Sequence, residues 1–153
     1  YGYSKWWVRD ISTHEFGHSF VNEPLFVYHK ELMKHQHLLK PIAKKMRKQA
    51  YGDWVTVLAE HLVRMGEVRI ADLLGLEEES KEKLKYNYLD RNFIYLPYFL
   101  KVIKKYEGNS DYKSFQDFIP VIVNSLSKID IKQAKKRWKK VNREWKKQKR
   151  KIK

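Results

Sequence analysis

Residues 11–24 read ISTHEFGHSFVNEP and contain an uninterrupted HExxH segment from His14 to His18. Side chains four residues apart lie one above the other on a helix, so His14 and His18 can each offer a ring nitrogen to one zinc ion. Glu15 lies about a third of a turn from His14, so its carboxylate can reach a water beside the metal rather than the metal itself. A carboxylate in that place can take a proton from the water. The segment therefore predicts a zinc-binding helix suited to hydrolysis.

The flanking residues predict where this helix is buried and where it ends. We expect burial of four apolar side chains: Ile11, Phe16, Phe20 and Val21. Pro24 predicts an end at Asn22–Glu23, because the residue before a proline disfavours the helical conformation. Residues 1–9 are rich in Tyr and Trp and predict a short extended segment that enters the core.

Two residues can cap the start of this helix. Ser12 and Glu15 have the spacing of a capping box, which would occupy the Glu15 carboxylate. Asp10 can cap the helix instead, and we favour it because that choice leaves Glu15 free.

Composition limits the class of protein. The 153 residues fit one domain, and 42% of them are hydrophobic, as in globular proteins. There is no cysteine, so a zinc site must use His, Asp or Glu. The formal charge of +15 is concentrated near the C-terminus, because residues 132–153 hold 13 basic side chains and one acid. The sequence gives no compartment.

A second helix carries the third candidate ligand. Residues 25–50 predict a helical stretch interrupted at Pro41. A long helix then runs from Trp54 to about residue 74, between a Gly52–Asp53 start and a stop at Gly75. Glu60 stands in its apolar middle, where a carboxylate must be paired or must bind a metal. An ion pair with Arg64 and a role as zinc ligand are both open, and they do not exclude each other.

Helix geometry favours Glu60 over its acidic neighbours as the third ligand. Asp53, Glu60 and Glu67 share one face but are spaced by about 10 Å, so only one can meet the metal. Asp53 is the expected helix cap, and we expect Glu67 to lie towards the open end, satisfied by water and arginine. The sequence therefore predicts that Glu60 approaches both imidazoles.

The remaining residues complete a mainly α domain. Ser114 and Asp117 predict a capping box for a helix that ends near Leu126, and Asp130 predicts the start of the last helix. We expect one compact unit over residues 1–129 and a basic amphipathic helix or tail over residues 130–153.

The segments HEFGHSFVN, EHLVR and FIYLPYFLKVIKKYE together resemble a known bacterial group. This group is a domain-of-unknown-function family with the motif HEFGHSFVNP, similar to gluzincin-type zinc metallopeptidases. The resemblance covers roughly residues 10–126. It implies zinc bound by His14, His18 and Glu60, with Glu15 as catalytic base. It also implies the helical part of a zincin-like domain whose upstream sheet is largely absent, and it alone favours a secreted or extracytoplasmic location.

The expected function is zinc-dependent hydrolysis of a peptide or protein substrate. Tyr95, Tyr98 and His61 are candidate donors to the oxyanion. The alternative is a non-catalytic zincin-like module that binds an anionic partner through its basic tail. Residues 132–153 predict contact with an anionic surface or polyanion, because an apolar stripe lies opposite the lysines. No motif predicts a specific nucleic acid.

Overall fold

The computed structural model describes residues 5–151, with the side chains of residues 11–148 and of Arg150. It is 78% helical, and the described part contains no strand, which confirms the mainly α prediction. The α-helices are α1 (Lys5–Val27), α2 (His29–Met33), α3 (Ala43–Arg47), α4 (Trp54–Leu73), α5 (Glu77–Lys85), α6 (Leu96–Val102), α7 (Lys104–Glu107), α8 (Phe115–Ser125) and α9 (Ile131–Lys151). Three short helical turns are η1 (Gln36–Leu39), η2 (Tyr86–Asp90) and η3 (Leu126–Lys128).

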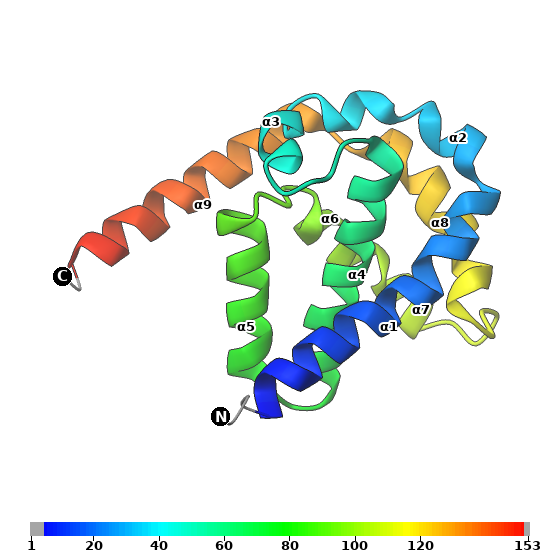
Figure 1. The fold of residues 1–153 in the computed structure, drawn as a ribbon, viewed down its shortest axis with the longest axis horizontal. Coiled ribbons are helices and arrows are strands. Elements are labelled where there is room, and N and C mark those ends of the chain that lie inside the picture. Colours follow the sequence, from blue (N-terminus) through cyan, green and yellow to red (C-terminus); the bar gives the residue numbers. More distant parts are fainter. Residues whose placement is uncertain (1–4, 152–153) are drawn as a thin grey trace.

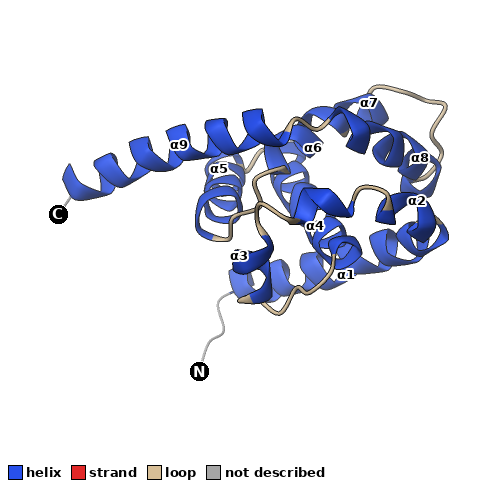
Figure 2. Cartoon of the chain, turned by 90° about the horizontal axis from the view of Figure 1, so that it is seen from above, coloured by secondary structure: helices blue, strands red, loops and turns tan. Residues whose placement is uncertain are grey.

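Helix α4 is the centre of the fold and is surrounded by α1, α2, α5 and α6 (Figures 1 and 2). Its start is fixed by Asp53, whose carboxylate accepts a hydrogen bond from the Thr56 N–H at 2.9 Å. Its end is followed by Gly75 at φ +72°, a conformation that favours glycine. Twelve of its twenty residues are buried. The predicted cap, stop and burial of this helix are confirmed.

The core around α4 is aromatic. The bulkiest fully buried side chains are Trp54, Tyr95, Phe93, Phe99 and Phe118. Helix α8 brings Phe118 into this core, and it begins with the predicted capping box, in which Ser114 and Asp117 bond each other's backbone N–H. Among the segments after α4, α5 and α6 pack directly on α4, whereas α8 packs on α1.

Helix α1 is longer at both ends than the sequence predicted. It begins at Lys5, so neither Asp10 nor Ser12 caps it and the extended segment over 1–9 is wrong from Lys5 onward; residues 1–4 lie outside the described range. Pro24 lies inside the helix, which continues to Val27. Burial of Val21 and Leu25, one turn apart, holds these last turns against the core and outweighs the local preference around the proline.

Residues 25–50 are more broken than predicted. The stretch divides into the end of α1, then α2, η1 and α3, with breaks at Tyr28 and around Lys34 as well as near Pro41. Each short piece presents one buried apolar side chain to the core, Leu32, Leu38 and Met46 respectively. This segment therefore wraps the core rather than forming a helix with a long apolar face.

Three of the four apolar side chains predicted to be buried on α1 are exposed. Ile11, Phe16 and Phe20 are 41%, 68% and 63% exposed, and only Val21 is buried. Phe16 lies about 200° round the helix from His14, so it must face away when the histidines face α4. Phe20 lines an open apolar hollow of about 270 Å³ between α1, α4, α7 and the first residue of α8.

Helix α9 starts where predicted and extends away from the other helices (Figures 1 and 2). The Asp130 carboxylate accepts a hydrogen bond from the Gln133 N–H at 3.0 Å. The indole N–H of Trp138 donates a hydrogen bond to the Tyr88 carbonyl at 2.8 Å and holds the first turns of α9 against η2. None of the helices in the described range is long and apolar enough to cross a membrane.

Candidate metal centre

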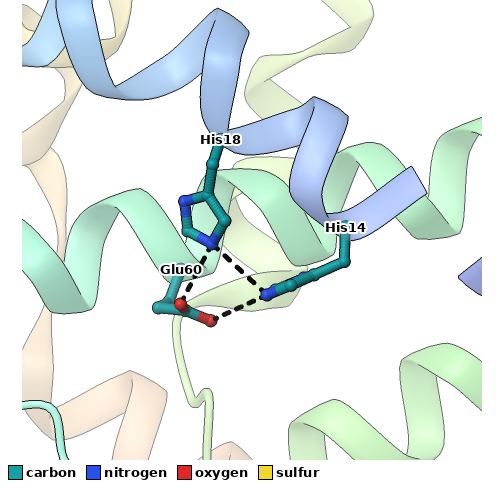
Figure 3. A group of neighbouring side chains, drawn as sticks. All are labelled: His14, His18 and Glu60. Atoms are coloured by element: carbon teal, nitrogen blue, oxygen red, sulfur yellow. Dashed lines mark hydrogen bonds and ion pairs between the residues drawn. The ribbon is translucent and has the colours of Figure 1, made fainter. Parts of the chain in front are cut away.

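The crossing of α1 over α4 brings together His14, His18 and Glu60 (Figure 3). The two imidazole Nε2 atoms are 3.3 Å apart. Glu60 Oε1 lies 3.2 Å from His18 Nε2, and Glu60 Oε2 lies 3.9 Å from His14 Nε2. Glu60 is 6% exposed and the imidazoles are half-buried, so one side of the cluster remains open. The predicted approach of Glu60 to both imidazoles is therefore observed.

A glycine permits this close crossing. A Cβ atom on Gly17 would lie 2.9 Å from Cγ1 of the buried Val63 on α4, closer than two carbon atoms normally approach. Valine is branched and stiff, so it cannot turn aside cheaply. Gly17 thus allows α1 to lie close enough to α4 for its histidines to meet Glu60.

Hydrogen bonds to Nδ1 determine how both imidazoles are oriented. His14 Nδ1 lies 2.9 Å from Glu67 Oε1, and because a carboxylate only accepts, Nδ1 carries the proton. His18 Nδ1 donates in the same way to Asn22 Oδ1 at 3.2 Å. In the neutral imidazoles Nε2 is then left as a lone pair. Both lone pairs point towards the Glu60 carboxylate.

A metal ion satisfies this arrangement better than a proton. A proton on either Nε2 can point at one acceptor at a time, whereas an ion takes a lone pair from each of the three side chains. Ligands about 2.0–2.1 Å from a tetrahedral zinc ion are separated from each other by about 3.3 Å. Two of the three distances here, 3.3 and 3.2 Å, are close to that value, and the third, from Glu60 Oε2 to His14 Nε2, is longer at 3.9 Å. The donor set of two imidazoles and one carboxylate is one that zinc accepts. The three residues fit the ion.

Arg64 bonds the two buried carboxylates of α4, those of Glu60 and Glu67. Its guanidinium donates to Glu60 Oε2 at 3.2 Å and to Glu67 Oε1 at 3.4 Å. The ion pair predicted from sequence between Glu60 and Arg64 is therefore present beside the imidazole contacts. Burial alone would raise the pKa of Glu67, but the hydrogen bond from His14 and the charge of Arg64 outweigh burial and lower this pKa below its ordinary value.

Glu67 is a correction to the sequence prediction. It was expected near the open end of the helix, satisfied by water and arginine, but it is 6% exposed and bonds His14. Two carboxylates seven residues apart on a helix are too far apart to meet one metal ion. An imidazole has two nitrogens, however, so His14 lies near Glu60 through Nε2 and near Glu67 through Nδ1.

Glu15 is exposed and forms no hydrogen bond or ion pair with any described residue. The competing role in a capping box is excluded, because Ser12 lies in the interior of α1 rather than at its start. The carboxylate is thus available beside the cluster, although the structure assigns it no contact.

The three candidate oxyanion donors are engaged elsewhere. Tyr95 donates to the Leu38 carbonyl at 2.7 Å, and Tyr98 donates to the Ser125 carbonyl at 2.6 Å. His61 is fully buried, donates from Nδ1 to the Val57 carbonyl at 2.7 Å, and contacts the rings of core aromatic residues. Burial lowers the pKa of His61 to about 4, so it is neutral at physiological pH. None of these groups is free to serve the cluster.

Sequence reasoning missed Tyr51, which lies beside the cluster. Burial, followed by the negative charge of Glu60, raises the pKa of the Tyr51 hydroxyl above its ordinary value. Arg91 donates a hydrogen bond to this hydroxyl at 3.3 Å. Tyr51 precedes the cap of α4 by two residues, and no spacing rule connects it to a carboxylate nine residues later.

The chain belongs to the family described as Domain of unknown function (DUF4932), whose model matches residues 5–125. The match includes both helices of the cluster and ends before α9. No curated protein and no solved structure matches the chain.

Proposed function

We propose that this protein is a zinc-dependent peptidase of the gluzincin type. The observation that supports the proposal is the convergence of two imidazole Nε2 atoms and a buried carboxylate at the partly open side of an HExxH helix. His14, His18 and Glu60 would hold the ion. Bound zinc supplies Lewis-acid chemistry, polarising a carbonyl and making water more acidic.

The protein's own residues would divide the remaining tasks. The Glu15 carboxylate would accept a proton from the attacking water, because it is exposed and not engaged by another described group. Glu67 and Asn22 keep the proton of each imidazole on Nδ1, which leaves Nε2 available. Arg64 limits the movement of Glu60 by bonding one of its oxygens.

A cavity beside His18 offers a place for a substrate side chain. Its volume is about 220 Å³, and its lining is mostly apolar: His18, Asn22, Leu25, Phe26, Val55, Thr56 and Ala59. Phe26 is 76% exposed and forms part of the wall. This apolar lining favours a peptide with an apolar side chain next to the bond that is cleaved.

The test is hydrolysis of an unstructured protein such as casein by the zinc-loaded chain, compared with Glu15→Gln. The amide is nearly the same size as the carboxylate but cannot accept the proton, so turnover should fall by a factor on the order of 100 or more while zinc stays bound. Glu23→Gln, another exposed acid on α1, is the matched control and should keep full activity.

A wild-type chain that binds zinc but hydrolyses nothing would contradict the peptidase proposal and favour the non-catalytic module. Equal activity of wild type and Glu15→Gln would overturn the assignment of the base.

A further inference from the structure

Most of the basic residues of α9, nine of twelve, lie on one face of the helix, and Arg137 is among the three outside it. Nine basic residues lie within an arc of about 140° at 100° per residue, and all nine are exposed. They are Lys132, Lys135, Lys136, Lys139, Lys140, Arg143, Lys146, Lys147 and Arg150. We call this set the basic face. None of its members forms an ion pair with a described residue, so their charge is not neutralised within the described part of the chain.

The apolar stripe on the opposite side of α9 is already occupied. Ile131, Ala134 and Trp138 pack against the core, and Trp138 bonds the Tyr88 carbonyl. Further along, the ammonium of Lys85 lies 4.2 Å from the centre of the Trp145 ring. An amphipathic helix binds a membrane by burying its apolar face among the lipids. Here the first turns of that face, from Ile131 to Trp138, pack on the protein's own core, and Trp145 further along contacts Lys85, which argues against lipid as the partner.

The spacing of the basic face matches a phosphate backbone. From Lys132 to Arg150 the helix axis extends about 27 Å, which gives about one positive charge per 3 Å. One strand of a nucleic-acid duplex carries one phosphate per about 3.4 Å of axis. The helix diameter of about 10–12 Å also fits a major groove about 12 Å wide.

We infer that the basic face docks on the phosphate backbone of a nucleic-acid duplex without reading its sequence. Seven of the nine residues are lysines, which act as point charges rather than as the bidentate donors that read base edges. Single strands are bound mainly by stacking of bases on aromatic rings, and the two tryptophans of α9 are turned towards the body. A duplex is therefore the better fit. This inference does not depend on the proposed peptidase activity.

The experiment measures binding of the full chain to a fluorescent 20-base-pair DNA duplex as salt is raised. If four to six phosphates are contacted, log K should fall against log salt with a slope of about −4 to −5. Replacing Lys136, Lys139, Arg143 and Lys146 by Gln should weaken binding on the order of 100-fold and reduce the slope by about one for each contacting charge removed.

The matched control replaces Lys44, Lys45, Arg47 and Lys48 by Gln. These are also three lysines and one arginine, all exposed, but they lie on and beside α3. This control variant should bind the duplex as tightly as the wild type does if the basic face is the binding site. Equal weakening of both variants would show that total charge alone drives binding and would overturn the inference. Tighter binding to the single strand, or to vesicles of equal parts phosphatidylglycerol and phosphatidylcholine, would also overturn it.

Discussion

Helices α1 and α4 both supply side chains to the candidate metal centre, but they are held in very different ways. Helix α4 is buried for most of its length, capped by Asp53 and surrounded on several sides. On α1, only three residues of the described side chains, Val21, Pro24 and Leu25, are buried, and large apolar side chains face outward. The comparison indicates that the position of α4 is fixed by its buried surroundings. The position of α1 depends on a few contacts, and those at the metal-ligand cluster are among them.

The largest expected effect tests whether α4 is held by its buried surroundings. The folded-state pKa of His61 is lowered from 6.5 to about 4, so between these values only the unfolded chain takes up this proton. The free energy of unfolding should therefore fall as pH drops from about 6.5 to 4, by about 3 kcal/mol from this group. His61→Leu should remove that part of the pH dependence, measured by urea unfolding at several pH values. An unchanged pH profile would show that His61 is not neutral and buried in solution.

Zinc should protect α1, the more weakly held of the two helices, from local opening. At a free zinc concentration about 100 times the Kd, an ion bound only by the folded cluster raises the free energy of unfolding by about 2.7 kcal/mol. This corresponds to a factor of about 100 in the unfolding equilibrium constant. Hydrogen exchange should therefore slow by up to that factor in residues 11–22 on adding zinc, and speed up again with a chelator. Openings of α4 that displace Glu60 also release the ion, so exchange in the middle of α4 should slow by the same factor, from an already lower rate. Faster exchange in α4 than in α1 before zinc is added would mean that α1 is not the weaker element.

Loss of the Glu67 contact should weaken zinc binding without removing it. Groups that orient a metal-binding histidine typically change metal affinity by about 10–100-fold. Glu67→Leu should show a loss in this range in a zinc titration. Glu67→Gln keeps an acceptor oxygen for His14 Nδ1 and should lose less. If the two variants bind zinc equally tightly, the hydrogen bond to His14 has no orienting role.

The smallest effect concerns the spacing between the two helices. Gly17→Ala places a methyl group against Val63 and should destabilise the fold by about 1–3 kcal/mol. Gly66→Ala on α4 is the matched control, because a Cβ there meets nothing within 4 Å. It should be neutral or slightly stabilising in thermal unfolding. Combining Gly17→Ala with Val63→Ala should recover part of the loss due to crowding, as a double-mutant cycle would show.

The sequence predicted α4 better than α1 for a physical reason. The cap at Asp53, the stop at Gly75 and burial on nearly all sides are local signals, and each was confirmed. The extent of α1 depends instead on packing against α4, which outweighed the local signal at Pro24. A helix that turns His14 and His18 towards α4 must turn Phe16 outward, so here helix geometry outweighs the general tendency of apolar side chains to be buried.

In the candidate site, too, the features that arise within one helix were predicted and those that depend on packing between helices were not. Helical spacing within α1 and burial within α4 were enough to predict that His14, His18 and Glu60 meet. The contact of His14 with Glu67 and the position of Tyr51 depend on how the two helices cross, and no spacing within one helix encodes that angle. The roles of these residues in binding zinc and in catalysis remain predictions.

The most direct test of the central claim is the zinc content of the purified full chain after dialysis. We predict one zinc ion per wild-type chain, and loss of that ion in His18→Ala. His29→Ala, which alters an exposed histidine on α2, should keep one ion per chain. Absence of bound zinc from the wild type, or equal zinc in wild type and His18→Ala, would contradict the claim that His14, His18 and Glu60 form a metal centre.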